Sequence, residues 1–162
     1  MNILNTEIDD FRKTDDGKII QGASHTSRVL NHKYRNRVII EAYTKLKKVD
    51  FWYDAIVCSG TSGMIVVPQI AELLKKNIII IRKKNDNSYS DFIVEGPHTN
   101  QYIIIDDLIC SGSTVKYIIN NIREESSRSK CMGIYTYMKD ECAYRNRPDL
   151  CLRDLKIQYL NS

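Results

Sequence analysis

The sequence carries four short apolar runs rich in β-branched residues, and each run ends at a polar turn. The runs cover residues 54–58, 77–81, 101–106 and 131–137. Continuous apolar runs of this length are typical of strands that are buried on both faces, as in a parallel sheet. The pattern therefore predicts that these runs form the central strands of one sheet.

Helical spacing separates the runs. Apolar side chains recur every three or four residues over 38–49 and over 115–122, where polar side chains occupy the opposite face. Residues 64–76 also fit a helix, although Pro68 leaves its start open because proline fits best in a first turn. Alternating strands and helices predict an α/β fold with an open, mainly parallel, twisted sheet flanked by helices.

Length and composition limit the class of protein. A chain of 162 residues suits a single domain, and 43% hydrophobic with 27% charged residues fits a globular protein. No apolar run approaches the roughly 20 residues of a membrane-spanning helix, and the net charge of +4 is too mild to indicate nucleic-acid binding. Five cysteines without a C-x-x-C pair indicate neither a disulfide framework nor a zinc site. With no secretory signal at the N-terminus, we expect a cytoplasmic protein.

The strand at 101–106 ends in two adjacent acids, Asp106 and Asp107, and a loop of small residues precedes the next helix. Backbone N–H groups and hydroxyls in such a loop, with the positive end of the helix, form a phosphate cradle. Gly112 allows the positive φ that this bend needs. The cradle residues are Ser111, Gly112, Ser113 and Thr114.

The two acids call for a different part of the ligand. A carboxylate repels phosphate but accepts hydrogen bonds well from vicinal hydroxyls, such as those of a ribose. The segment therefore predicts a ribose 5-phosphate site, with Asp106 and Asp107 at a solvent-open edge of the sheet.

Residues 102–115 resemble the phosphoribosyl diphosphate (PRPP) signature of type I phosphoribosyltransferases. That signature is an apolar strand, two acids, two variable residues and then T/S-T/S-G-x-T. Cys110 stands where the family usually has Thr or Ala. The matching residues are Asp106, Asp107, Ser111, Gly112 and Thr114.

Residues 58–63 resemble the family loop that binds pyrophosphate through backbone amides. In the adenine and hypoxanthine branches this loop holds a cis peptide bond, which would fall at Gly60–Thr61. Those branches often place Arg or Lys at the position of Ser62, so positive charge for the pyrophosphate must come from elsewhere. The resemblance implies binding roles for Ser59, Gly60, Thr61, Ser62 and Gly63.

Arg82 and Lys83 match the family's Arg-Lys pair at the end of the next strand, ahead of a loop that closes over the substrates. The resemblance implies that Arg82 binds substrate and that Lys83 or Lys84 stabilises the departing pyrophosphate. Tyr89, in a Ser-Tyr pair like that of adenine enzymes, would help to exclude water. The alternative is a solvated basic turn.

Taken as a whole, the resemblance implies a phosphoribosyltransferase that exchanges the pyrophosphate of PRPP for a nucleobase, in nucleotide salvage. Its cofactor would be Mg²⁺, bound through PRPP, pyrophosphate and water, so no residue is assigned as a metal ligand. Asp107 is the acid that could accept a proton from the base. The Arg-Lys pair and the Ser-Tyr loop favour a purine, adenine ahead of hypoxanthine or guanine, while orotate or another base stays open. The resemblance also implies a homodimer.

The resemblance covers residues 54–122, and it implies one domain over 1–162 with a core at about 50–137. In this family the chain ends form a hood that selects the base, here 1–49 and 138–162. A non-catalytic PRPP-binding regulator with the same fold is the main alternative, because of Ser62 and because the flanks of the chain diverge from the family. A methyltransferase-like nucleotide loop is disfavoured, because such a loop needs two or more glycines and this segment has only Gly112. Neither G-x-G-x-x-G nor G-K-[ST] occurs.

Overall fold

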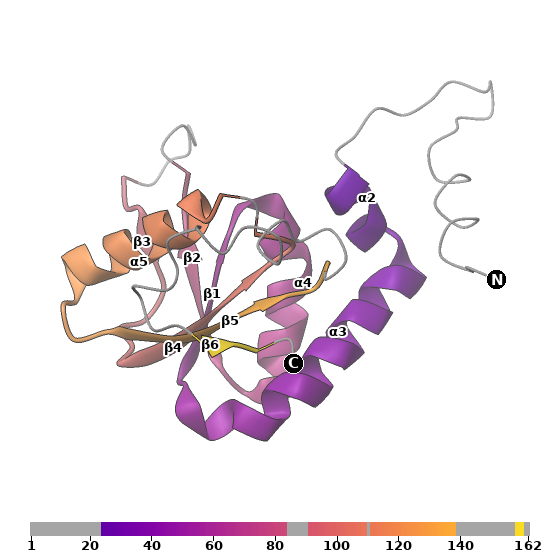
Figure 1. Cartoon of the computed structure of the whole chain (residues 1–162), viewed down its shortest axis with the longest axis horizontal. Coiled ribbons are helices and arrows are strands. Elements are labelled where there is room, and N and C mark those ends of the chain that lie inside the picture. The colour runs from indigo at the N-terminus through magenta and orange to yellow at the C-terminus, as the bar shows by residue number, and fades with distance from the viewer. Residues whose placement is uncertain (1–23, 84–90, 110, 139–157, 161–162) are drawn as a thin grey trace.

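The computed structural model describes residues 24–83, 91–109, 111–138 and 158–160. The strands in these residues form one six-stranded sheet with the order β3-β2-β1-β4-β5-β6 (Figure 1). All neighbouring strands are parallel except β2 and β3, which confirms a mainly parallel sheet. The strands are β1 (Ala55–Ser59), β2 (Asn77–Ile81), β3 (Val94–Glu95), β4 (Gln101–Asp106), β5 (Lys130–Thr136) and β6 (Gln158–Tyr159).

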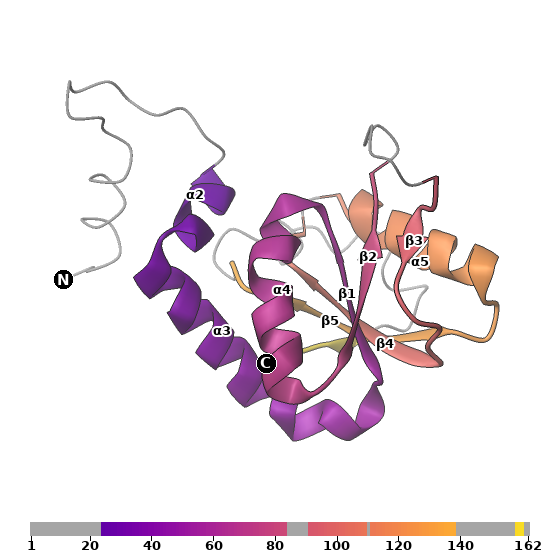
Figure 2. The same ribbon diagram turned by 180° about the vertical axis from the view of Figure 1, so that it is seen from behind.

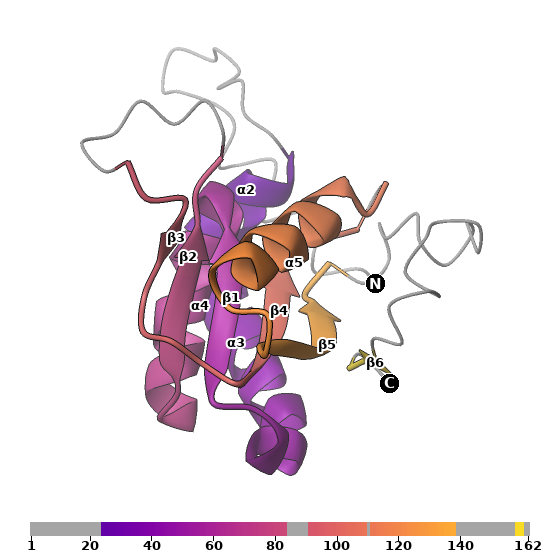
Figure 3. The same ribbon diagram turned by 90° about the vertical axis from the view of Figure 1, so that its left-hand side faces the viewer.

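Helices cover both faces of the sheet, with α3 and α4 on one side and α5 on the other (Figures 1 and 3). From behind, α3 and α4 are seen to lie side by side (Figure 2). None of the described helices is long and apolar enough to cross a membrane. The helices are α2 (Ser24–Leu30), α3 (His32–Leu46), the 3-10 helix η2 (Lys47–Trp52), α4 (Gly60–Leu74) and α5 (Ser113–Glu125).

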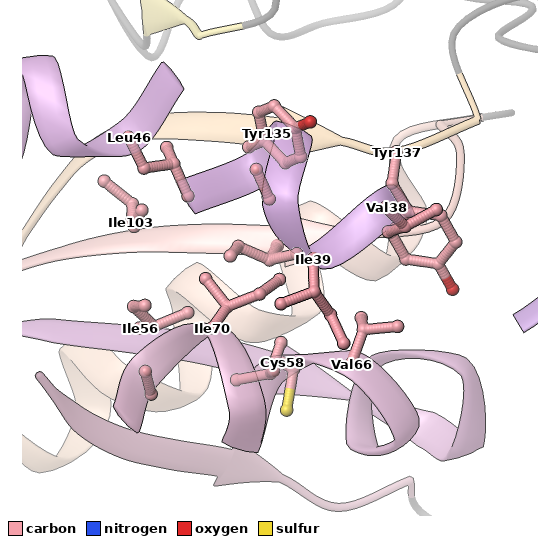
Figure 4. Close-up of a cluster of buried hydrophobic side chains, with 14 of the residues drawn as sticks. Val38, Ile39, Leu46, Ile56, Cys58, Val66, Ile70, Ile103, Tyr135 and Tyr137 are labelled. Atoms are coloured by element: carbon pink, nitrogen blue, oxygen red, sulfur yellow. The ribbon is translucent and has the colours of Figure 1, made fainter. Parts of the chain in front are cut away.

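The core has two halves because successive side chains of a strand point to opposite faces. Ile56 and Cys58 of β1 join the cluster beneath α3 and α4, which Figure 4 shows in close-up. Ala55 and Val57 join the cluster beneath α5. Every residue of β1 is buried, as the continuous apolar run predicts for a central strand.

Helix α3 belongs to this core, because Val38, Ile39, Ala42 and Leu46 are all buried in it. The predicted periodicity extended to Val49, and this is wrong: the α-helix ends at Leu46, and Val49 has the non-helical angles φ −125° and ψ 15°. The assignment of residues 1–49 and 138–162 to a hood stays a prediction.

Helix α4 begins at Gly60, four residues before the predicted start at 64. Residues 60–63 are therefore the first turn of a helix rather than a separate loop. Pro68 lies in the helix interior, where it removes one backbone hydrogen bond. Burial of Val66, Val67 and Ile70 against the sheet offsets that loss.

Gly63 lets the first turn of α4 approach β1 closely. A Cβ atom at Gly63 would lie 2.7 Å from the Cβ of Cys58. Gly63→Ala should therefore force the helix away from the strand and lower the free energy of unfolding by about 1–3 kcal/mol. Thermal unfolding measures the effect, with Thr61→Ala at an exposed position of the same turn as the control. An unchanged melting temperature for Gly63→Ala would contradict the close approach.

Candidate functional site

The carboxyl ends of β1 and β4 lie at the topological switch point of the sheet, where the order of the strands along the chain reverses. After β1 the chain passes through α4 to β2 on one side, and it later returns to β4 on the other side of β1. Ligands of open α/β sheets bind in the crevice beyond the strand ends at such a point.

The two strands separate at this place. β1 pairs with β4 only from Ala55↔Tyr102 to Val57↔Ile104. The end of β1 stays paired with β2 as far as Ser59↔Ile81, and the end of β4 stays paired with β5 as far as Asp106↔Thr136. The strand ends therefore diverge, and a cavity of about 340 Å³ opens beyond them.

The cavity brings together most of the residues that the sequence singled out. Three segments contribute: the start of α4, the end of β2, and the stretch from the end of β4 into α5. The lining residues are Ser59, Ser62, Lys83, Asp106, Asp107, Leu108, Ile109, Ser111, Gly112, Ser113, Thr114 and Val115. Lys84, Tyr89 and Cys110 lie outside the described residues.

The two acids line the cavity but are buried, with exposed fractions of 8% for Asp106 and 9% for Asp107. The expectation of a solvent-open edge is therefore wrong. Strand β5 extends alongside them, since the N–H groups of Tyr137 and Met138 donate to the carbonyl oxygens of Asp106 and Asp107 (3.3 and 2.9 Å). The backbone of both acids is thus hydrogen-bonded to the segment at the end of β5.

Each acid also folds back onto the chain. Oδ1 of Asp106 accepts from the backbone N–H of Asp107 at 2.9 Å, and Oδ1 of Asp107 accepts from the N–H of Leu108 at 2.7 Å. These bonds hold both carboxyl groups at the cavity wall.

Burial, and after it the negative charge of Asp107, raises the pKa of the Asp106 carboxyl to about 7. The backbone N–H of Asp107 and the charge of Lys83 act in the opposite direction. A hydroxyl donor or a cation in the cavity would likewise favour the ionised form of Asp106.

The loop after the acids bends as predicted. Gly112 has a left-handed conformation, with φ 77° and ψ 1°, and α5 starts at the next residue. The Oγ atoms of Ser111 and Ser113 are hydrogen-bonded at 2.8 Å, and Ser111 Oγ also accepts from the N–H of Ser113 at 3.3 Å. The N–H of Ser113 is thus bonded within the loop. Thr114 and Val115, the next residues of the first turn of α5, also line the cavity, so their N–H groups and the nearby hydroxyls have the composition of a phosphate cradle.

The start of α4 provides a second group of donors. Ser59 is only 6% exposed and lines the cavity, yet its Oγ has no hydrogen-bond partner among the described residues. A buried hydroxyl at a cavity wall that has no protein partner can donate to a ligand in the cavity. The N–H groups of the first helical turn form the positive end of the α4 dipole, which favours a negatively charged group at this place.

Lys83 brings positive charge to this helix start. A Cβ atom at Gly60 would lie 3.1 Å from Cε and 3.2 Å from Nζ of Lys83, so the lysine side chain lies over the first residue of α4. Lys83, which follows β2, therefore supplies positive charge at the start of α4.

Arg82, Gly60, Thr61 and Gly63 do not line the cavity. The Arg82 guanidinium instead forms an ion pair with Glu95 of β3 at 3.0 Å, because β3 pairs with the end of β2. Tyr117 of α5 donates to the Arg82 carbonyl oxygen at 3.1 Å. Arg82 therefore connects β2, β3 and α5 at the sheet edge, and its location gives no support to the predicted contact with substrate.

The expectation of a cis peptide bond at Gly60–Thr61 is wrong, since the described residues contain no cis bond. Gly60 makes the change of direction instead, with φ 75° at the start of the helix.

Sequence reasoning missed Tyr137, which follows β5. Its hydroxyl donates to the carbonyl oxygen of Ser62 at 3.2 Å, in the first turn of α4. The run at 131–137 identified a strand, but nothing in its pattern separates Tyr137 from Tyr135. Only the three-dimensional placement of β5 next to the acids reveals it.

The buried acid makes stability depend on pH. The folded protein penalises ionised Asp106, so it retains a proton that the unfolded chain has released between the ordinary pKa of 3.8 and about 7. The free energy of unfolding should therefore fall as pH rises through this window. Asp106→Asn should stabilise the ligand-free protein at pH 8 by on the order of 1–3 kcal/mol, and the gain should vanish toward pH 4.

Urea unfolding at a series of pH values measures this difference. Asp54→Asn, at an exposed acid at the other end of the sheet, is the control. A stabilisation by Asp106→Asn that is the same at pH 4 and pH 8 would contradict the account.

No protein-family model matches the sequence, and no curated protein matches it. Solved structures do match. Orotate phosphoribosyltransferase from Aeropyrum pernix superposes with a TM-score of 0.62 at 12% identity, over 90% of this chain and 80% of its own. Adenine phosphoribosyltransferase from Trypanosoma brucei, in complex with AMP, pyrophosphate and ribose-5-phosphate, has a TM-score of 0.60 at 12% identity, over 97% and 77%.

UMP synthase from Leishmania donovani matches 90% of this chain with a TM-score of 0.58 at 19% identity, and the chain spans 30% of its length. The three structures share a fold with this chain across most of the described residues. The resemblance seen in residues 102–115 is thus confirmed at the level of architecture: the chain has the fold of the type I phosphoribosyltransferases.

Proposed function

We propose that this protein is a phosphoribosyltransferase, which transfers the ribose 5-phosphate of PRPP to a nucleobase and releases pyrophosphate. The observation that carries the proposal is the convergence of two helix starts, two buried acids and one lysine on a single cavity. The fold shared with the adenine and orotate enzymes supports the same reading.

The β4 side of the cavity would hold the ribose 5-phosphate. The bend at Gly112 and the first turn of α5 provide donors for the 5-phosphate. Asp106 and Asp107 would accept hydrogen bonds from the ribose hydroxyls. The ribose hydroxyls, as donors, would favour the carboxylate form of Asp106, which burial disfavours in the ligand-free protein.

The α4 side would hold the pyrophosphate. Its donors are the N–H groups of the first helical turn and the partnerless Ser59 hydroxyl. Lys83 adds the positive charge that balances the growing negative charge on the leaving oxygen. Additional roles for Lys84 and Tyr89 stay predictions.

The chemical step needs little acid–base catalysis from the protein. As the bond from C1 to the leaving oxygen lengthens, positive charge develops on the sugar and negative charge on the pyrophosphate. Lys83 and the helix starts stabilise the negative charge, and the Asp106–Asp107 pair lies where it can stabilise the positive charge. Asp107 is also our candidate for accepting a proton from the incoming base.

The donor set also fits Mg²⁺. The cavity offers the carboxyl groups of Asp106 and Asp107, which can contact the ion directly or through water, while the described residues contain no group of three or more His, Cys, Asp or Glu that could hold a metal. Such a pair suits an ion that takes most of its ligands from diphosphate oxygens and water. When bound, Mg²⁺ supplies further charge neutralisation on the pyrophosphate.

A purine, adenine first, is the proposed base, on the strength of the sequence resemblance. The structural neighbours include both adenine and orotate enzymes, so orotate is part of the test. The alternative of a non-catalytic regulator was based on Ser62 and on the divergent flanks of the chain, and the position of Lys83 over Gly60 answers the first of these in favour of the enzyme. A homodimer and a role in salvage stay predictions from the resemblance, and a cytoplasmic location stays a prediction from the N-terminal sequence.

Pyrophosphate release from PRPP and Mg²⁺ tests the function directly, with adenine, hypoxanthine, guanine and orotate offered in turn. We expect release with a purine and none without a base. PRPP binding in calorimetry without release for any base would identify the regulator instead. A protein that neither binds PRPP nor releases pyrophosphate would refute the proposal.

Lys83→Met removes the cation over the start of α4 while keeping the length of the side chain. We expect kcat for pyrophosphate release to fall about 100-fold, because one stabilising group is lost where charge develops. Lys130→Met is the control, at an exposed position at the opposite end of the sheet. A kcat equal to that of the control would exclude Lys83 from the leaving-group site.

A further inference from the structure

The two halves of the cavity are carried by different parts of the sheet. The end of β1, which leads into α4, stays paired with β2. The end of β4, which holds the acids, stays paired with β5. Between them the sheet has no ladder beyond Val57↔Ile104. The pairing of β1 with β4 therefore does not set the separation of their ends, so contacts beyond the ladder must do so.

Tyr137 makes such a contact. Its backbone N–H donates to the carbonyl oxygen of Asp106, which places it at the acid side of the cavity (3.3 Å). Its hydroxyl donates to the carbonyl oxygen of Ser62, in the first turn of α4 (3.2 Å). One residue thus bridges the acid side and the helix side where the strands no longer pair.

The side chain of Tyr137 is held firmly. It is 7% exposed and belongs to the buried cluster formed with α3 and α4, part of which Figure 4 shows. Burial, and after it the charge of Asp107, raises the pKa of the Tyr137 hydroxyl, so it stays protonated and remains a donor. A buried ring with few accessible rotamers makes a stiff connection.

We propose that Tyr137 is a positioning residue that sets the distance between the two halves of the cavity by tethering the first turn of α4 to the acid-bearing strand end. This inference rests on the proposed function in one respect: PRPP is the ligand that reaches both halves. A ligand confined to the β4 half, such as ribose 5-phosphate, does not depend on their separation.

Tyr137→Phe removes the tethering hydroxyl and keeps the buried ring. In calorimetry with Mg²⁺, we expect its Kd for PRPP to rise about 3- to 10-fold, the effect of losing one hydrogen bond, with little change for ribose 5-phosphate. Equal weakening of both ligands, or no change for PRPP, would overturn the proposal.

Tyr53→Phe is the matched control. Tyr53 is also buried, at 1% exposure, lies in the same cluster, and donates its hydroxyl to the carbonyl oxygen of Leu46 at 3.4 Å, before β1 and away from the cavity. The two variants lose the same kind of hydrogen bond. Only Tyr137→Phe should change the ratio of the two dissociation constants.

Amide hydrogen exchange on the ligand-free protein tests the tether without any substrate. We expect the amides of residues 63–67, which close the first turns of α4, to exchange several-fold faster in Tyr137→Phe than in Tyr53→Phe. Unchanged exchange would overturn the tether. If the wild-type protein binds neither PRPP nor ribose 5-phosphate, the proposed function fails, and the exchange result still decides the role of Tyr137.

Discussion

The separation of β1 from β4 is the constraint on which the rest of the site depends. A continuous ladder to the ends of both strands would bring Ser59 and Asp106 to neighbouring positions and leave no cavity. The separation is possible because each end keeps another partner, β2 for one and β5 for the other. The helices that follow are then directed to opposite faces of the sheet, and both begin at the same cavity.

This arrangement also explains the electrostatics. The start of each helix contributes partial positive charge, and Lys83 adds a full one, beside the Asp106 carboxyl group, which burial makes costly to ionise. Ionisation of Asp106 is therefore the unfavourable element of the site. A ligand that brings hydroxyl donors to the acids and anionic groups to the helix starts relieves both imbalances together, which makes the site selective for a molecule that carries both.

Local sequence patterns predicted what depends on local structure. The runs at 77–81 and 101–106 match β2 and β4 residue for residue. In β4 the continuous apolar run corresponds to burial on both faces, whereas in β2 only Ile79 and Ile81 are fully buried. The Gly112 bend followed from the only glycine in its loop. What failed involves tertiary contacts: the backbone of Asp106 is hydrogen-bonded to the end of β5, the first turn of α4 packs closely on Cys58, and Arg82 forms an ion pair with a residue of β3.

The position of the two helix starts limits the ligand further. A simple phosphate monoester such as ribose 5-phosphate carries one anionic group and can satisfy one helix start, leaving the buried Ser59 hydroxyl or the Gly112 cradle without a partner. A sugar that is phosphorylated at both ends satisfies the two starts at once and presents its hydroxyls to Asp106 and Asp107 between them. PRPP, the proposed substrate, has this pattern of charge. On that proposal, the loss of pyrophosphate would leave the α4 side unsatisfied again, and the same geometry would then favour release of the mononucleotide product.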